Sequence, residues 1–532
     1  MGGEFERSAD TAANTLPGDL LLVIPAVLAG VALALLGQVS AKIEVAALLA
    51  IIAAAGAGFL IWRLRDPARN MFWAVAAALP VAATLVPPRH FLVSAFDVAM
   101  ALVFVLIVWR RLFARGPERP TEAVQGEIPV ERALFPTRSL VIVFLTAAPI
   151  FIWSRFPPIA ALALLSFAAY YAFFLMCLRE LARPGGFRRL VLLWSTLVIV
   201  MSLASVVGRL AGMQLSLSGV NINQLGEGLT MNERASGFFQ DPQKAAQFFA
   251  CSFVFLLVLT IRSRFEERAL RWLLPLAMVF AFTGIVVAVS RASLLAAVVI
   301  GTVSVLLFNR WSTVTRLVVA AFLVGGAFAI YLLPAGLWLS VLPADLAARF
   351  SLLASSYTVR SHIWYDTWEM FADHRLTGIG PGSFRPYLLE TRPTVKNFYD
   401  IGNGTGFEYI PDQPESGYFK IFYEGGLLGS AAALLLAVEA IRRFLRVAVS
   451  RQAADEARTD VCAAFAAVMV FALSFVTLFI SDPPNLALLM FLLALIWHRS
   501  LHGGFEESPA SAPVAAPAGN RAPGGATPGA TR

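Results

Sequence analysis

Residues 245–261 read AAQFFACSFVFLLVLTI, an apolar run close to the length needed to cross the hydrocarbon core of a bilayer. About thirteen further runs of this kind follow one another along the chain. The 532-residue sequence is 58% hydrophobic and only 14% charged, whereas soluble domains carry roughly 25% charged residues. The sequence therefore predicts an all-α polytopic membrane protein with about 12–14 transmembrane helices. The predicted spans cover residues 20–37, 43–62, 71–86, 91–109, 139–153, 159–178, 190–208, 245–261, 270–289, 293–308, 317–333, 418–441, 461–480 and 484–498.

The loops between these runs alternate in charge. Lys and Arg gather in every second loop, and the intervening short loops hold almost none. Because basic loops stay in the cytoplasm, the pattern predicts that both termini are cytoplasmic and that the long loops 209–244 and 334–416 face outward. The net charge of +8 then follows from topology and does not indicate a nucleic-acid partner. The basic loops are residues 63–70, 110–138, 179–189, 262–271, 309–316 and 442–458.

Composition divides the chain into five parts. The expected order is a cytoplasmic N-terminus, a transmembrane bundle with the outer loop 209–244, a large periplasmic catalytic loop, C-terminal transmembrane helices and a disordered cytoplasmic tail. The tail is rich in Ala, Pro, Gly and Ser, which cannot build a core. The boundaries are 1–19, 20–333, 334–416, 417–502 and 503–532.

Charges and thiols inside the apolar runs are few. Asp97 is one such charge, and it is either a polar residue that packs between helices or part of an ion path. The chain shows neither two matching halves nor a charged path, so transport is the weaker hypothesis. All three cysteines also lie in apolar runs, where they are expected to be inert and unpaired.

Four arginines are predicted at the outward face, where basic residues are disfavoured: Arg209, Arg234, Arg291 and Arg360. Any one of them has an ordinary explanation, contact with a lipid headgroup or a carboxylate. If several converge, they form a pocket for a dianion, because the planar guanidinium binds phosphate oxygens in pairs. An outward-facing enzyme has no ATP, so the expected donor is a glycan on a polyprenyl pyrophosphate.

The loop 334–416 contains an amphipathic segment at about residues 357–372, predicted to be a helix that lies on the membrane or caps the bundle. Arg360 and Trp364 share one face of it. The sequence GIGPG at 378–382 predicts a tight turn and lacks the context of a phosphate-binding loop. His362 and His374 have no third ligand at metal spacing, so no metal site is expected.

Two glutamates mark the return of the chain to the membrane. Glu415 lies in PESG at 414–417 and is either a general base or a residue favoured by the helix dipole. Glu424, in EGGLLG at 424–429, is expected to make a structural hydrogen bond.

The order of these features resembles the O-antigen ligase and polymerase family of membrane glycosyltransferases, over roughly residues 200–440. The resemblance lies in the segments Arg234–Ala246 and Ser290–Ser293, and in Arg360–Phe384 followed by Glu424–Gly429. It implies a type-C glycosyltransferase fold, a donor linked to undecaprenyl pyrophosphate, inversion at the anomeric carbon, and no metal or cofactor.

The resemblance also implies residue roles. The arginines that hold the pyrophosphate correspond to Arg291, Arg360 and Arg234. Ligases of the family carry His-Asn nine residues before the conserved glutamate, whereas this chain has Glu415-Ser416 nine residues before Glu424. A carboxylate base in place of the histidine favours a polymerase over a ligase acting on lipid A.

The sequence-based hypothesis is thus a metal-independent polymerase of a surface polysaccharide in the bacterial inner membrane. It transfers a glycan to an acceptor sugar at the periplasmic face, with a flippase or chain-length regulator as further partners. Ligation to lipid A-core and non-enzymatic transport of a glycan or lipid are the alternatives. The aromatic residues Trp364, Trp368, Phe384 and Tyr418 either stack on sugars or pack at the interface. The predicted catalytic residues are Glu415, Arg360 and Arg291, and the predicted substrate-binding residues are Arg234, Arg209, His362, Trp364, Arg385 and Glu424.

Overall fold

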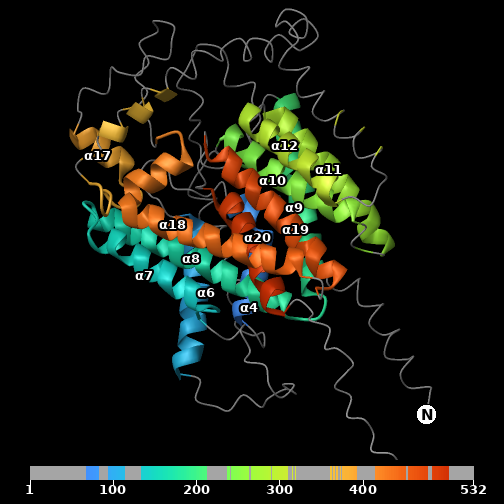
Figure 1. Ribbon diagram of the computed structural model, residues 1–532, viewed down its shortest axis with the longest axis horizontal. Helices are drawn as coiled ribbons and strands as arrows, with labels where there is room; N and C mark the ends of the chain where they lie inside the picture. The colour runs from blue at the N-terminus through green and yellow to red at the C-terminus, as the bar shows by residue number, and fades with distance from the viewer. Residues whose placement is uncertain are drawn as a thin grey trace, which may run out of the picture.

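The computed structural model describes a little over half of the chain, and its regular structure there is helical, with no β-strand (Figure 1). The described residues are 67–82, 94–113, 134–211, 237–239, 241–262, 267–288, 290–308, 414–450, 453–476 and 482–502, most of 360–391, and single residues at 265, 314, 318 and 321. The helices are α4 (Pro67–Ala77), α5 (Leu79–Ala82), α6 (Ala95–Phe113), α7 (Arg138–Ile152), α8 (Pro157–Leu181), α9 (Gly186–Ala211), α10 (Pro242–Ile261), α11 (Arg268–Ala288), α12 (Arg291–Phe308), α17 (Phe384–Thr391), α18 (Gly417–Val449), α19 (Asp455–Ser474) and α20 (Pro483–His502).

Seven of these helices, α8, α9, α10, α11, α18, α19 and α20, are long and apolar enough to cross a membrane. Three shorter apolar helices are found within α6, α7 and α12. The all-α polytopic fold class is thereby confirmed. The predicted spans at 20–37 and 43–62, and nearly all of the one at 317–333, lie outside the described residues.

Helix α10 contains the run AAQFFACSFVFLLVLTI and lies in the core of the bundle, against α9, α11, α12, α19 and α20. Its start is set locally: the Asp241 side chain accepts a hydrogen bond from the Gln243 amide at 2.7 Å, and Pro242 occupies the first turn. Phe248, Phe249 and most of the other side chains are buried, as expected for a helix that is hydrophobic on all sides.

Two other sequence expectations are resolved in the bundle. Asp97 is buried and accepts hydrogen bonds from the Ser94 amide and hydroxyl at 2.6 and 2.7 Å, while the Ser94 hydroxyl accepts from the Asp97 amide. This reciprocal pair is a capping box at the start of α6. Local helix capping therefore explains why a carboxylate stands at position 97 in an apolar run, and no ion path is needed. The cysteines Cys177, Cys251 and Cys462 are buried and unpaired, as expected.

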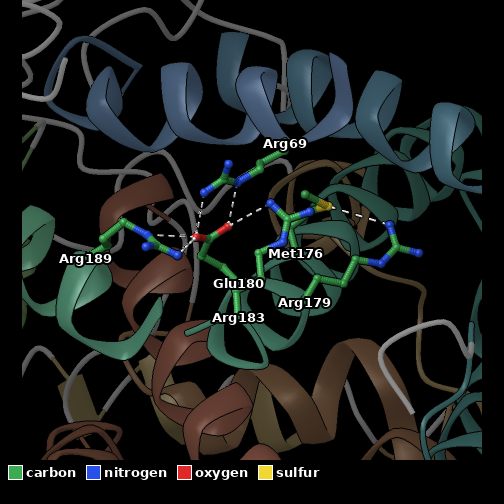
Figure 2. Close-up of polar contacts among 6 residues, drawn as sticks. All are labelled: Arg69, Met176, Arg179, Glu180, Arg183 and Arg189. Carbon is green, nitrogen blue, oxygen red and sulfur yellow. Dashed lines mark hydrogen bonds and ion pairs between the residues drawn. The ribbon is translucent and has the colours of Figure 1, made fainter. Parts of the chain in front are cut away.

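The end of the bundle where α8 turns into α9 is held by buried charge (Figure 2). The Glu180 carboxylate, 2% exposed, accepts paired hydrogen bonds of 3.0 Å from Arg69 of α4. Arg189 of α9 lies 2.7 Å away and Arg183 3.7 Å away. One carboxylate thus joins three segments of the chain, and we name this set of four residues the Glu180 cluster.

Candidate active site

Two predicted site residues meet at the opposite end of the bundle. Nη2 of Arg360 lies 3.9 Å from Oε2 of Glu415, and the two side chains are 25% and 22% exposed. The contact is too long for a hydrogen bond, so it is a loose ion pair open to solvent. Its guanidinium and carboxylate are accessible to a substrate.

The backbone at Glu415 is strained. Its φ of 51° makes it the only non-glycine residue with a positive φ in the described part of the chain. The next two residues explain the strain, because the Ser416 hydroxyl and the Gly417 amide both bond to the Phe475 carbonyl, at 3.2 and 2.8 Å. The residue after α19 therefore fixes the direction in which the chain enters α18, and with it the position of Glu415.

Helix α18 is broken at Gly426, where φ is 61° and ψ is −156°. The turn containing GIGPG fills the break. The amides of Ile379 and Gly380 bond to the carbonyls of Tyr423 and Glu424 at 3.3 and 3.0 Å. In return the amides of Leu427 and Leu428 bond to the carbonyls of Arg375 and Leu376, just before GIGPG, at 2.8 and 3.1 Å. The turn supplies partners for backbone groups that the broken helix leaves unpaired.

Glycine is required on both sides of this contact. A Cβ on Gly378, whose φ is +68°, would lie 2.3 Å from the Glu424 carbonyl oxygen. A Cβ on Gly426 would lie 2.4 Å from the Gly378 nitrogen. The glycine-rich turn and the Gly-Gly pair of α18 are thus two halves of one packing contact.

The same turn is tied to the corner between α7 and α8. The Arg155 amide bonds to the Ile379 carbonyl at 3.1 Å, and the Arg155 side chain forms a 2.7 Å ion pair with Glu390 of α17. Its hydrogen bonds to Glu390 hold the pKa of that carboxyl below its usual value. Figure 1 shows α17 beyond the ends of α7 and α18.

The segment that carries Arg360 is helical at the positions described between 360 and 369, as predicted. Trp364 stacks on Phe419 and Trp368 on Phe422, with ring centroids 5.7 and 5.8 Å apart. The first turns of α18 thus hold the segment in place. Of the four aromatic residues expected to stack on sugars or pack, all pack within the protein, since Phe384 contacts Tyr423 and Tyr418 contacts Phe475.

An apolar groove of about 300 Å³ lies between α7 and α18 and adjoins this site. Small residues of α18 form much of its wall, and its polar lining side chains are Lys420 and Glu424. Glu424 is 8% exposed, and among the described residues nothing donates a hydrogen bond to its carboxylate. The structural hydrogen bond expected of this side chain is therefore not found there. The lining residues are Ala147, Ile150, Phe151, Phe167, Pro381, Gly417, Lys420, Ile421, Glu424, Gly425, Gly429, Ala432, Ala433 and Phe475.

The other predicted site residues are distributed differently. Arg385 is exposed on α17, and Arg209 lies in the last turn of α9. Arg291 begins α12, but its side chain, with Arg234 and His362, lies outside the described residues. No group of three His, Cys, Asp or Glu side chains that could hold a metal ion is present in the described part.

Sequence reasoning missed Lys420 and Arg155. The sequence does contain a signal for Lys420, because it belongs to a stripe of residues at helical spacing that all line the groove. The stripe consists of Gly417, Lys420, Ile421, Glu424 and Gly425. Arg155 has none, since its contacts are all with residues distant in the sequence.

A family model described as O-antigen ligase matches residues 276–434. Residues 276–434 of the chain thus form an O-antigen ligase domain. The matched segment contains Arg360, the glycine turn, Glu415 and the α18 wall of the groove. Members of this family are multi-pass membrane proteins of O-antigen ligase or polymerase-type glycan transfer, and the family implies lipid-linked glycan substrates. No curated protein matches the chain.

Proposed function

We propose that this protein polymerises a surface polysaccharide at the periplasmic face of the bacterial inner membrane. The donor is a glycan on undecaprenyl pyrophosphate, and the acceptor is a sugar hydroxyl of a second glycan. The observation that carries the proposal is the open Arg360–Glu415 pair beside an apolar groove. A lipid-linked sugar needs both parts, a charged site for its reacting end and an apolar path for its chain.

In the proposed reaction the acceptor hydroxyl oxygen attacks the anomeric carbon of the donor. The bond from that carbon to the phosphate oxygen breaks, and the pyrophosphate leaves on its lipid. Arg360 neutralises the charge that grows on the leaving oxygen, an effect larger in the transition state than in the ground state. Glu415 accepts the proton of the attacking hydroxyl.

The loose ion pair links these two roles. Arg360 faces Glu415 at 3.9 Å. A bound pyrophosphate, with more negative charge than one carboxylate, competes for the guanidinium. The Arg360 contact of Glu415 is then given up when the donor is in place, which raises the basicity of the carboxylate toward the acceptor hydroxyl.

Arg291 and Arg234 are proposed as further arginines at the pyrophosphate, with Arg209, His362, Trp364 and Arg385 nearer the glycan. The predicted basic loops correspond to the end with the Glu180 cluster, which we assign to the cytoplasm. The active site then faces the periplasm, where a flippase and a chain-length regulator are the expected partners.

Glu415-Ser416 in place of His-Asn supports polymerisation, whereas the match of residues 276–434 to an O-antigen ligase family supports ligation as the second candidate. Purified protein in lipid, given undecaprenyl-pyrophosphate repeat units alone, tests both. A ladder of multiples in the product is the expected result. Unreacted repeat units would reject polymerisation, and transfer after addition of lipid A-core would then establish ligation.

A further inference from the structure

The charged part of the groove has no role in the mechanism above. We propose that Lys420 binds the phosphate of the donor lipid nearest its polyprenyl chain, and that the remaining groove between α7 and α18 holds the first part of that chain. This inference rests on the proposed function for the identity of the lipid. It assigns a contact to a residue outside the predicted site.

The first argument is position. Lys420 lies on the groove-facing stripe of α18, in the turn after Glu415, and its amide bonds to the Ser416 carbonyl at 3.0 Å. Side chains on a helix lean toward its N-terminus, which here is the end carrying Glu415 and Arg360. Lys420 is thus the cation of the groove wall that lies nearest in the chain to Glu415, and its long stem gives the ammonium group reach along that wall.

The second argument is charge. Among the described residues that line the groove, only Lys420 and Glu424 carry formal charges. Glu424 is more than nine-tenths buried, and the described residues give its carboxylate no partner. Without Lys420 the groove would carry an uncompensated negative charge and repel a phosphate. Lys420 balances this charge on the described lining of the groove, and it lies nearer in the chain to Glu415 than Glu424 does.

The third argument is the shape of the rest of the groove. Beyond Glu424 the α18 wall consists of Gly425, Gly429, Ala432 and Ala433, and the facing wall of α7 supplies Ala147, Ile150 and Phe151. Small residues on one helix leave a channel, and the apolar lining suits a hydrocarbon chain but no sugar. The occupant that matches both parts is a lipid with a phosphate at its end.

The test is equilibrium binding of two probes to the full chain in lipid nanodiscs, undecaprenyl pyrophosphate and unphosphorylated undecaprenol. Lys420→Met keeps the stem and removes the charge. It is expected to weaken binding of the pyrophosphate lipid by about tenfold to a hundredfold and to leave undecaprenol unchanged. Lys420→Arg is expected to bind like the wild type. Arg446→Met, an exposed cation on the same helix at its other end, is the matched control and should change neither affinity.

Two further variants sharpen the result. Ala433→Phe fills the groove and is expected to weaken both probes. The double variant Lys420→Met/Glu424→Gln removes both charges and so restores neutrality. If Lys420 contacts the phosphate, the affinity of this variant for the pyrophosphate lipid stays low. Wild-type affinity in the double variant would overturn the contact, because Lys420 would then only offset Glu424.

Equal loss of both probes in Lys420→Met, or no loss, would also overturn the inference. Lys420→Gln serves as the second variant should Lys420→Met not fold, as judged by its thermal unfolding midpoint. Binding is measured without turnover, so the two proposals fail separately. A wild type that binds the pyrophosphate lipid through Lys420 but forms no ladder would reject polymerisation alone.

Discussion

The Glu180 cluster and the Arg360–Glu415 pair use the same two residue types at opposite ends of the bundle. In the Glu180 cluster the carboxylate is buried and lies within 3.0 Å of two guanidiniums, with a third at 3.7 Å (Figure 2). At the candidate active site the closest charged atoms are 3.9 Å apart, and more than a fifth of each side chain is exposed.

The difference separates structural charge from charge that can bind a substrate. A buried carboxylate is stable only when its oxygens accept enough hydrogen bonds. Such a group has no acceptor position left for a ligand. A loose, exposed pair contributes little to stability. It can exchange its internal partner for a substrate at small cost.

The largest effect expected from this comparison is on stability. Glu180→Ala should lower the free energy of unfolding by about 3–5 kcal/mol, because it removes charge-assisted hydrogen bonds to two guanidiniums and leaves three partly exposed arginines without the carboxylate that they share. Glu456→Ala, which removes an exposed carboxylate from the first turn of α19, should change it by less than about 1 kcal/mol. If an SDS-unfolding titration gave the same loss of unfolding free energy for both variants, the Glu180 cluster would contribute no more to stability than an exposed carboxylate.

The complementary effect is on turnover. Arg360→Ala should reduce glycan transfer at least about 100-fold, by analogy with the removal of one oxyanion-stabilising donor, with little change in unfolding free energy. Arg360→Lys should recover part of the rate, since it restores charge without the planar fork. The rate is measured as product formed from undecaprenyl-pyrophosphate repeats. Full activity of a folded Arg360→Ala protein would remove this arginine from the mechanism.

A third change tests whether the broken helix holds the active site in place. Gly378→Ala introduces a Cβ 2.3 Å from a backbone oxygen at a positive φ, and should cost about 1–3 kcal/mol in unfolding free energy. Gly301→Ala in α12, where the added Cβ meets its nearest neighbour at 3.5 Å, should be neutral or slightly stabilising. A tolerated Gly378→Ala would contradict the packing of the turn into the break.

The smallest effect concerns the exposed ion pair that ties α17 to the α7–α8 corner. The pKa of the Glu390 carboxyl is lowered by its hydrogen bonds to Arg155. Its contribution is therefore present above the usual glutamate value of 4.5 and is lost as the pH falls through the lower value of the folded protein. Arg155→Gln should flatten this part of a plot of unfolding midpoint against pH. An unchanged slope below pH 4.5 would show that the pair adds nothing measurable.

Much of the fold could be predicted because the relevant signals are local. Span length and hydropathy identify α8, α9, α10, α11, α18, α19 and α20 without reference to any distant residue. The N-terminal caps at Ser94 and Asp241 are equally local. Glu415 and Arg360 were also predicted from the sequence as site residues, by residue type and expected depth in the membrane, and their role in catalysis stays a prediction.

What remained hidden depends on contacts between distant segments. The residues of GIGPG predict a turn, but not that it enters a break in α18. Nor does any local signal pair Arg155 with Glu390, or Glu180 with Arg69. The low hydropathy of Lys420 marks it only as polar, and its place in a groove depends on how α7 packs against α18.

The sequence by itself thus determined that this protein is an all-helical membrane protein, and it predicted which segment carries the polar chemistry. Burial in a bilayer requires long apolar runs, and their length and order can be counted along the chain. Only the tertiary structure decided that Arg360 meets Glu415 in a loose pair and that Glu180 is saturated. Ion-pair distance and exposure are set by helix packing, which brings together residues that no short stretch of sequence contains.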